Sequence, residues 1–204
     1  MKIPDTYAAI ITAAGRGTRA GEGPPKQWRA LSGRSVLARS IEAFADFPRI
    51  VVTLAPEDMA QGVAELSGPV TLIAGGATRS DSVRAALDSL EGSGVTHVLI
   101  HDGARPLVSD AVIAGVLRAL QAGAPAAAPA LPVTDALWRA EGGHVTASAS
   151  RDGLMRAQTP QGFALDAILA AHRAAPDGAA DDVELAIRAG IPVTVTPGDE
   201  DRSE

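Results

Sequence analysis

The sequence predicts an α/β fold, a three-layer sandwich in which helices cover both faces of a mainly parallel sheet. Three observations indicate this class. Short apolar runs recur along the chain, and they are typical of strands that are buried on both faces. Amphipathic helical patterns alternate with these runs. Glycines and charged residues follow several of the runs, at the place where parallel sheets bind their ligands.

Five apolar runs predict strands in the first part of the chain. They span residues 8–13, 50–54, 70–74, 98–100 and 126–130. Leu37, Ile41 and Phe44 recur at helical spacing, which predicts an amphipathic helix over residues 35–45. Pro56 suits the first turn of the next helix, because the N–H that proline lacks has no partner at that position.

Helical patterns continue after the third run. Val83, Leu87 and Leu90 share one face of a predicted helix. Ser109 and Asp110 can cap a further helix, whose core face is formed by aliphatic residues.

The last part of the chain returns to the same alternation. Residues 164–174 predict a helix, Asp181-x-x-Glu184 resembles a capping box, and residues 193–196 form a last strand. Residues 198–204 are polar and carry no strand pattern.

The alternation is interrupted at residues 131–157, which contain no helical period. Residues 133–138 and 144–148 flank Glu141-Gly142-Gly143, a pattern that predicts a hairpin. A hairpin of this size that carries Trp138 has little core of its own. We therefore expect a protruding arm that either folds back over the site or packs on another subunit, and we interpret residues 131–157 as a dimerisation arm.

Length and composition indicate one globular domain over residues 1–204, or one domain with a small appendage, and 46% of the residues are hydrophobic. The net charge of −6 argues against a protein that binds nucleic acids or membrane surfaces. The absence of cysteine excludes disulfides, thiolate zinc sites and cysteine nucleophiles. The start of the sequence lacks the apolar region of a secretory signal and no stretch is long enough to span a membrane, so we expect a soluble, cytoplasmic protein.

The first apolar run ends in a glycine-rich, cationic loop. Gly15 and Gly17 let backbone N–H groups approach a ligand, while Arg16, Arg19 and Lys26 add positive charge. Because these features suit a polyphosphate, we interpret the loop as a nucleotide triphosphate site.

Three other interpretations of this loop are weaker. Gly15-x-Gly17-x-x-Ala20 fits a dinucleotide fingerprint formally, but Pro24 and Pro25 prevent the long helix that should follow directly. A P-loop needs Gly-Lys-Ser or Gly-Lys-Thr, which is absent. A glycine-rich surface turn with incidental arginines is the third. Lys26 argues against it. Only two of the 18 basic residues are lysines, so a lysine here indicates that the compact charge of an ammonium group is needed in place of the planar guanidinium of arginine.

Two polar groups follow later strands. The segment from Gly75 to Ser82 can let a base approach the backbone, with Ser82 as a hydrogen-bonding partner, or it is simply a helix start capped by Ser80 and Asp81. Asp102, within His-Asp-Gly-Ala-Arg-Pro, can hold Mg²⁺ that bridges phosphate oxygens, or it is a turn aspartate.

A third polar group lies where the arm returns. Arg151 offers a bidentate fork for a phosphate monoester, or it pairs with an acid such as Asp152. His97 and His101 share one strand face, but no third ligand lies near in sequence, so we expect both to be structural.

Together these motifs resemble a known family. Ala-Ala-Gly-x-Gly-x-Arg followed by Pro-Lys-Gln is similar to the signature loop of nucleotidyltransferases that activate sugar and polyol phosphates. His-Asp-x-Ala-Arg-Pro and Asp-Gly-Leu-x-x-x-Gln-Thr-Pro-Gln-x-Phe follow in order, and over residues 7–195 the combination resembles the 2-C-methyl-D-erythritol 4-phosphate cytidylyltransferase family. This resemblance implies a nucleotidyltransferase (Rossmann-like) fold and cytidylyl transfer from CTP to that polyol phosphate in non-mevalonate isoprenoid biosynthesis.

The resemblance also implies roles for individual residues. Arg19 and Lys26 would stabilise the transition state, and Arg151 would position the acceptor phosphate. Asp102 would hold Mg²⁺. Contacts to CTP are implied for Ala13, Ala14, Gly15, Arg16, Gly17, Gly75, Ser82 and Asp102. Contacts to the polyol phosphate are implied for Arg105, Arg151 and Thr159. The family also implies a homodimer with interlocking arms.

Two features depart from the family pattern. Ala136 stands where the family usually has a threonine in the arm, which removes one expected contact to the polyol phosphate. The family carries a second functional lysine on a strand beyond residue 204. We therefore expect a truncated carboxyl end, with these residues forming the amino-terminal part of a longer chain, such as one fused to a second enzyme.

Two other functions fit the same residues. A cytidylyltransferase for another polyol phosphate, such as ribitol 5-phosphate, would have similar motifs. A non-catalytic nucleotide-binding module would bind CTP without releasing pyrophosphate. A dehydrogenase fits least well, and it would bind NAD.

Overall fold

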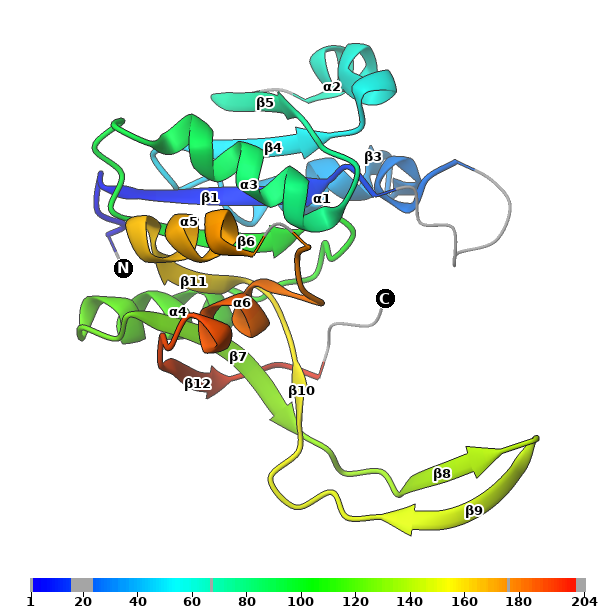
Figure 1. Cartoon of the computed structure of the whole chain (residues 1–204). Coiled ribbons are helices and arrows are strands. Elements are labelled where there is room, and N and C mark those ends of the chain that lie inside the picture. The colour runs from blue at the N-terminus through cyan, green and yellow to red at the C-terminus, as the bar shows by residue number, and fades with distance from the viewer. Residues whose placement is uncertain (1, 16–23, 67, 176, 201–204) are drawn as a thin grey trace.

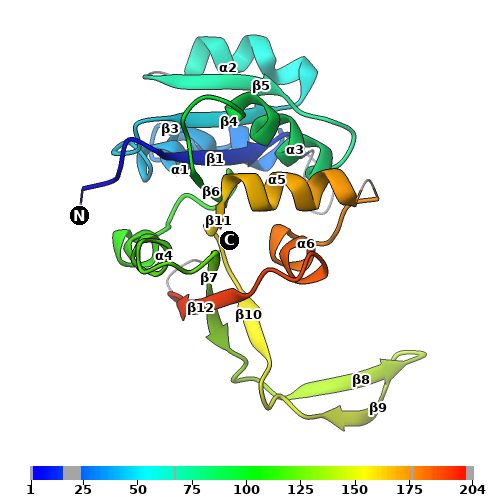
Figure 2. The same cartoon turned by 60° about the vertical axis from the view of Figure 1, so that its left-hand side comes forward.

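Two layers of helices enclose a mainly parallel sheet, which confirms the predicted fold class (Figure 1). The structure is a computed structural model that describes residues 2–15, 24–66, 68–175 and 177–200. The sheet stands between the helix layers, with α4 on one side and α5 and α6 on the other (Figure 2).

Within the described residues, eight strands form the main sheet. They are β1 (Tyr7–Ala13), β4 (Ile50–Leu54), β5 (Val70–Ala74), β6 (His97–Asp102), β7 (Ala126–Pro132), β10 (Met155–Ala157), β11 (Gln161–Ala164) and β12 (Val193–Pro197). The order across the sheet is β12, β7, β11, β6, β1, β4 and β5, and β10 pairs with the end of β7. The pairs of β10 and β11 are antiparallel, whereas the others are parallel.

The sequence analysis missed β10 and β11. These strands are three and four residues long, and Pro160 lies between them. Strands this short give too few positions to display an alternating pattern. Their places in the sheet depend on pairing with β6 and β7, which are distant in sequence.

Strand registers align the ends of the central strands. Thr12 in β1 pairs with Asp102 in β6 on one side and with Thr53 in β4 on the other. Leu54 in β4 pairs with Ala74, the last residue of β5. The loops that follow these four strands therefore leave the sheet at one edge, where open parallel sheets bind their ligands.

Six helices cover the sheet in the described part of the chain. They are α1 (Val36–Glu42), α2 (Met59–Glu65), α3 (Arg79–Leu90), α4 (Asp110–Gln121), α5 (Leu165–Ala174) and α6 (Asp182–Arg188). Odd-numbered side chains of β1 pack with α1 and α4, and even-numbered ones pack with α3, α5 and α6. The alternation of side chains along a strand thus divides the core into two halves.

Two predicted helix boundaries differ from the structure. α1 ends at Glu42, although Phe44 still reaches the core from the following turn. α3 is capped by Thr78, not by Ser80 or Asp81. The hydroxyl of Thr78 accepts a hydrogen bond from the N–H of Asp81, and the Asp81 side chain accepts one from the N–H of Thr78 in return. The segment after Gly76 is therefore a well-defined helix start, which was predicted as the alternative to a base-binding loop.

Short elements complete the chain. Two 3₁₀ turns, η2 (Lys26–Trp28) and η3 (Pro56–Asp58), follow the loops after β1 and β4. A small ladder joins β2 (Ala30–Leu31) to β3 (Arg34–Ser35).

A hairpin arm protrudes from the body, which confirms the prediction of a hairpin (Figure 1). β8 (Leu137–Glu141) and β9 (His144–Ala149) pair with each other in a sheet of their own. Gly142 and Gly143 connect them with φ angles of 56° and 82°, a conformation that glycine adopts without steric cost. Trp138 is 67% exposed on this arm. Its role in dimerisation stays a prediction.

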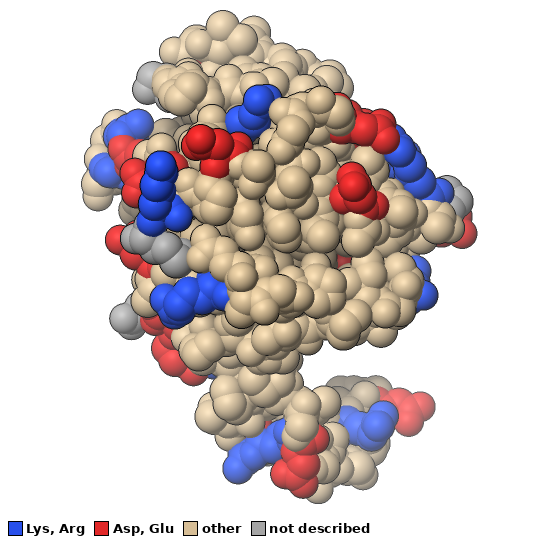
Figure 3. Space-filling view, turned by 90° about the vertical axis from the view of Figure 1, so that its left-hand side faces the viewer, with Lys and Arg blue, Asp and Glu red and all other residues tan. Residues whose placement is uncertain are grey.

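In the described residues, no helix combines the length and the apolar character that crossing a membrane requires. The face in Figure 3 carries Lys and Arg interspersed with Asp and Glu around a broad area of other residues.

Candidate functional site

A cavity of about 750 Å³ opens at the carboxyl ends of β1, β4, β5 and β6. It lies at the edge where the aligned registers place the four loops. Its walls are formed by Thr12, Ala13, Ala14, Gly15, Lys26, Gln27, Ala55, Pro56, Glu57, Gly76, Ala77, Thr78, Arg79, Ser82, Asp102, Ala104 and Arg105. Of the predicted site residues, the structure therefore brings together Ala13, Ala14, Gly15, Lys26, Ser82, Asp102 and Arg105.

The loop after β1 is held in place by Gln27. This buried side chain donates hydrogen bonds to the carbonyl oxygens of Ala13 and Gly15, each at 3.1 Å. Apart from Gly15 itself and its two chain neighbours, no described atom lies within 4 Å of a Cβ placed on Gly15, so among the described residues the backbone borders open space on that side. The predicted residues Arg16, Gly17 and Arg19 lie outside the described residues.

Lys26 lies at the start of η2, and its side chain is half-buried in the wall of the cavity. Trp28 braces this turn, because its indole N–H donates to Asp58 of η3 at 2.9 Å. Among the residues that the structure describes, no carboxylate forms an ion pair with Lys26. Its ammonium group thus borders the cavity without an ion pair from that part of the chain.

The loop after β5 packs closely against the loop after β1. A Cβ on Gly75 would lie 2.4 Å from the Cβ of Ala14 and 2.8 Å from the hydroxyl oxygen of Ser82. Gly75 therefore lies at a contact between the loops, and its neighbour Gly76 is the residue that lines the cavity. Ser82 is buried, accepts from the N–H of Gly76 at 3.1 Å and donates to the carbonyl of Thr78 at 2.9 Å.

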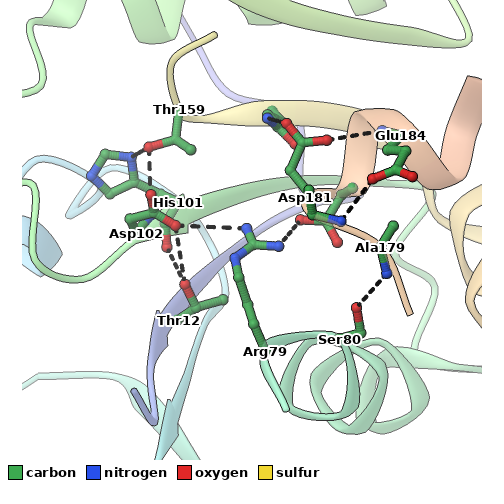
Figure 4. A network of polar contacts seen from close by, with 12 residues as sticks. Thr12, Arg79, Ser80, His101, Asp102, Thr159, Ala179, Asp181 and Glu184 are labelled. Atoms are coloured by element: carbon green, nitrogen blue, oxygen red, sulfur yellow. Dashed lines mark hydrogen bonds and ion pairs between the residues drawn. The ribbon is translucent and has the colours of Figure 1, made fainter. Parts of the chain in front are cut away.

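Asp102 at the end of β6 is surrounded by polar partners (Figure 4). One carboxylate oxygen accepts from Nε of Arg105 at 3.1 Å. The other lies 3.6 Å from Nη2 of Arg79 and 3.5 Å from the hydroxyl oxygen of Thr12. The side chain of Asp102 is 32% exposed, so it can still meet a ligand in the cavity.

Two buried residues support Asp102 from the core side. The Nε2 of His101 donates to the carbonyl of Arg105 at 2.9 Å, and its Nδ1 lies 2.9 Å from the Thr159 hydroxyl. The neutral imidazole satisfies both contacts, with Nδ1 accepting from Thr159. That hydroxyl also lies 3.5 Å from the N–H of Asp102. Thr159 is buried and is not among the residues that line the cavity, so the structure places it behind Asp102.

Arg79 is a residue of the cavity to which the sequence analysis gave no role. Its Nη1 donates to the buried carboxylate of Asp182 at 2.8 Å, and His172 Nε2 lies 2.9 Å from the other oxygen of that carboxylate. Burial disfavours the charged form of Asp182, but the hydrogen bond from His172 and the charge of Arg79 outweigh it and hold the pKa of Asp182 below its usual value. Burial likewise opposes the charge on Arg79, yet the carboxylates of Asp182 and Asp102 raise the pKa of Arg79 above its usual value.

Arg151 does not line the cavity of its own chain. It is exposed at the base of the arm, and its Nη1 donates to the carbonyl of Thr134 on the opposite side of that base. The acid expected as an alternative partner, Asp152, accepts instead from the hydroxyl of Ser150. Ala136 is also exposed, in the segment that leads into β8.

Asp102 fits a magnesium ion that arrives with a polyphosphate. The described residues contain no group of three or more His, Cys, Asp or Glu side chains suited to a metal. His97 stacks on Tyr7, and His101 packs against Phe44; the structural role of both histidines stays a prediction. Mg²⁺ is usually bound by one or two carboxylates together with substrate phosphates. A single cavity carboxylate meets this requirement when phosphate oxygens complete the coordination.

Comparisons with known proteins describe what the chain is similar to. The family model for 2-C-methyl-D-erythritol 4-phosphate cytidylyltransferase matches residues 7–203. The protein of that name from Cereibacter sphaeroides strain KD131 is 57% identical in an alignment 204 positions long, which covers 96% of this chain and 89% of that protein. A crystal structure of the protein of that name from Thermus thermophilus is 32% identical, has a TM-score of 0.82, and matches over 100% of this chain and 92% of its own.

A longer relative matches more closely in sequence. The bifunctional enzyme IspD/IspF of Paracoccus denitrificans is 86% identical over 201 residues, which cover 98% of this chain and 53% of that protein. The chain thus spans about half the length of the bifunctional relatives that it matches.

Proposed function

The chain belongs to the 2-C-methyl-D-erythritol 4-phosphate cytidylyltransferase family, and from this premise we propose that it transfers the cytidylyl group of CTP to 2-C-methyl-D-erythritol 4-phosphate. Pyrophosphate is the second product, and the reaction belongs to non-mevalonate isoprenoid biosynthesis. The observation that carries the proposal is the cavity, in which the loop after β1, basic side chains and Asp102 meet at one edge of the sheet.

The chemistry needs no general base. A phosphate monoester is largely dianionic at neutral pH, because its second pKa is near 6. One of its oxygens attacks the α-phosphorus of CTP and forms a new P–O bond. The bond between the α-phosphorus and the oxygen that bridges to the β-phosphate breaks, and pyrophosphate leaves with that electron pair. The protein therefore contributes mainly positioning and stabilisation of charge.

Lys26 is suited to the stabilisation of charge. Its ammonium group borders the cavity beside the loop after β1, and no described carboxylate forms an ion pair with it. We assign Lys26, with Arg19 outside the described residues, to the charge that develops between the α-phosphate and the leaving group. Backbone groups from Ala13 to Gly17 would hold the triphosphate, and the loop from Gly75 to Ser82 would border the base.

Magnesium fits this account at Asp102. When bound, the ion would neutralise charge on the phosphate oxygens, which reduces the repulsion between the two anionic substrates. Asp102 would supply the protein ligand, while Arg105 and Arg79 flank it. Removal of the ion with EDTA is expected to abolish turnover, and added Mg²⁺ to restore it.

The arm supports a homodimer. Arg151 would have to reach the acceptor phosphate, yet it lies at the base of the arm and does not line the cavity of its own chain. Trp138 and Val145 are 67% and 58% exposed on the same arm, which favours burial against another surface. We therefore assign the arm, residues 131–157, to an interface between two copies, through which Arg151 of one copy would serve the cavity of the other.

A pyrophosphate-release assay tests the proposed function. The chain is incubated with CTP and Mg²⁺ and with either 2-C-methyl-D-erythritol 4-phosphate or ribitol 5-phosphate as the acceptor. Release that depends on the methylerythritol compound supports the proposal. Release with ribitol 5-phosphate alone would identify a different polyol phosphate as the acceptor. Binding of CTP without release would identify a nucleotide-binding module.

A further inference from the structure

Arg79 connects the cavity to a buried pair of residues from distant parts of the chain. It is the first residue of α3, whereas His172 lies in α5 and Asp182 begins α6. Figure 4 shows Arg79 reaching across from α3, with one nitrogen toward Asp102 and another toward the start of α6. The chemistry proposed above uses neither His172 nor Asp182.

The carboxylate of Asp182 is fixed in orientation. One oxygen accepts from His172 Nε2 at 2.9 Å, and the other accepts from Arg79 Nη1 at 2.8 Å. Both side chains of this pair are buried: Asp182 is 1% exposed and His172 is 2% exposed. Because each oxygen has a partner and water is largely excluded, this carboxylate has little freedom to rotate.

The two carboxylates that Arg79 contacts differ in strength and exposure. The contact to Asp182 is short and reaches a buried group, whereas the contact to Asp102 is 3.6 Å and reaches a side chain that is 32% exposed. Asp182 is therefore the anchor of Arg79. Asp102 can turn toward a ligand in the cavity while Arg79 stays in place.

Stability alone accounts poorly for this arrangement. Replacing a buried ion pair by well-packed apolar residues is often neutral or stabilising, because burial of the charges is costly. The ion pair is placed where it orients a cationic side chain that borders the nucleotide cavity. Such orientation is what a site with little covalent chemistry of its own requires.

We propose that Asp182 and His172 are positioning residues for nucleotidyl transfer, which act by holding Arg79 beside Asp102 at the wall of the cavity. His172 orients the Asp182 carboxylate, Asp182 fixes Nη1 of Arg79, and the second guanidinium nitrogen then faces Asp102. This inference rests on the proposed function, since it assigns Arg79 to the nucleotide and metal end of that site.

Asp182→Asn is the central variant. The amide retains an oxygen that accepts from His172, but it turns an N–H₂ group toward Arg79, so the anchor is lost. We expect kcat/KM for CTP to fall about 10²-fold, the effect of displacing an active-site group by about 1 Å. The KM for the polyol phosphate is expected to stay within about twofold, because Arg79 acts at the nucleotide end.

Asp181→Asn is the matched control. Asp181 is the preceding residue and its charge also acts on Arg79, but its oxygens accept from the N–H of Glu184 and from Gln161 Nε2. Asparagine caps helices as well as aspartate does. Asp181→Asn should therefore keep wild-type kinetics, and an equal loss in both variants would overturn the proposal in favour of a general effect of negative charge.

Two further measurements separate positioning from folding. In an Arg79→Ala background, Asp182→Asn should cause no further loss of kcat/KM, since it acts through Arg79. His172→Gln retains an N–H donor for Asp182 and should keep near-wild-type activity, whereas His172→Leu should reproduce the defect. Additive losses in the double variant, or equal losses in both His172 variants, would contradict the proposal. If Asp182→Asn fails to fold, the two His172 variants decide the question.

Calorimetric titration with CTP keeps the inference separate from the proposed function. The dissociation constant of CTP with Mg²⁺ is expected to rise about tenfold in Asp182→Asn, with no change in Asp181→Asn. If the wild-type chain binds CTP but shows no turnover, the proposed function fails and this comparison still tests the role of Asp182. If the wild-type chain turns over and Asp182→Asn matches it in rate and affinity, the proposed function stands and the inference is wrong.

Discussion

Gly75→Ala is expected to damage the cavity more than the fold. A Cβ at this position would lie 2.4 Å from the Cβ of Ala14, whereas ordinary contact begins near 3.4 Å. The difference, 3.4 minus 2.4, requires the two loops to separate by about 1.0 Å. Neither contact is to the far end of a flexible side chain, because the other close atom is the hydroxyl oxygen of buried Ser82. The displacement must therefore move backbone that borders the cavity.

The magnitude follows from that displacement. Shifting an active-site group by about 1 Å can lower the rate about 10²-fold. Overpacking typically costs about 1–3 kcal/mol of unfolding free energy. For a domain of this size, 1 kcal/mol corresponds to about 2–4 °C in Tm, so Tm should fall by about 2–12 °C. The chain should thus stay folded at 25 °C and lose most of its turnover.

The assay combines initial rates of pyrophosphate release with calorimetric titration of CTP and a thermal melt. Gly15→Ala is the matched control for the melt, because in the described part of the chain no atom beyond its two neighbours lies within 4 Å of its Cβ. Its Tm should equal that of the wild-type chain, while CTP should bind more weakly if nucleotide occupies the space beside that loop. Wild-type affinity and rate in Gly75→Ala would refute the argument that packing of Ala14 against Gly75 shapes the site.

Three further predictions concern catalysis, assembly and stability. Lys26→Ala should lower kcat about 10²–10³-fold with little change in the CTP dissociation constant. Equal losses in kcat and in CTP affinity would show instead that Lys26 binds CTP in the ground state. Mixing Lys26→Ala with Arg151→Ala chains should restore activity above that of either variant alone if the arm serves the partner's cavity, and deletion of residues 134–148 should give a monomer in sedimentation. No recovery on mixing, or a deletion variant that still sediments as a dimer, would reject that arrangement. Gly115→Ala in α4 should raise the unfolding free energy by about 0.5–1 kcal/mol without changing kinetics, because outside its own helix the closest described atom, the Cβ of Thr196, would lie 3.8 Å from the added Cβ; a lower Tm would show overpacking at this position.

Parts of the site that depend on neighbouring residues could be predicted from the sequence. The loop after β1 is marked by adjacent glycines and cations, and the structure places Gly15 and Lys26 in one cavity. Asp102 ends a strand whose apolar pattern is clear. Such signals are local, so a single segment is enough to display them.

Other parts depend on contacts that no local pattern displays. Arg79 and Asp182 are 103 positions apart, and their ion pair follows from the packing of α3 against α5 and α6. Asp182 stands beside a capping aspartate, which gives it an ordinary explanation as a residue of a helix start. Thr159 belongs to a motif that suggested substrate contact, yet pairing of β11 with β6 buries it behind Asp102. The partners of these residues are set by the fold as a whole.

The central claim is that the cavity joins a CTP-derived cytidylyl group to a polyol phosphate, and ³¹P NMR of the reaction mixture tests it most directly. With CTP, Mg²⁺ and 2-C-methyl-D-erythritol 4-phosphate, the monoester resonance of the acceptor should disappear. The product should appear as two coupled diphosphate resonances, and pyrophosphate, formed in an equal molar amount, as a single resonance. An unchanged monoester resonance, or CMP formed by hydrolysis while the acceptor stays intact, would contradict the account.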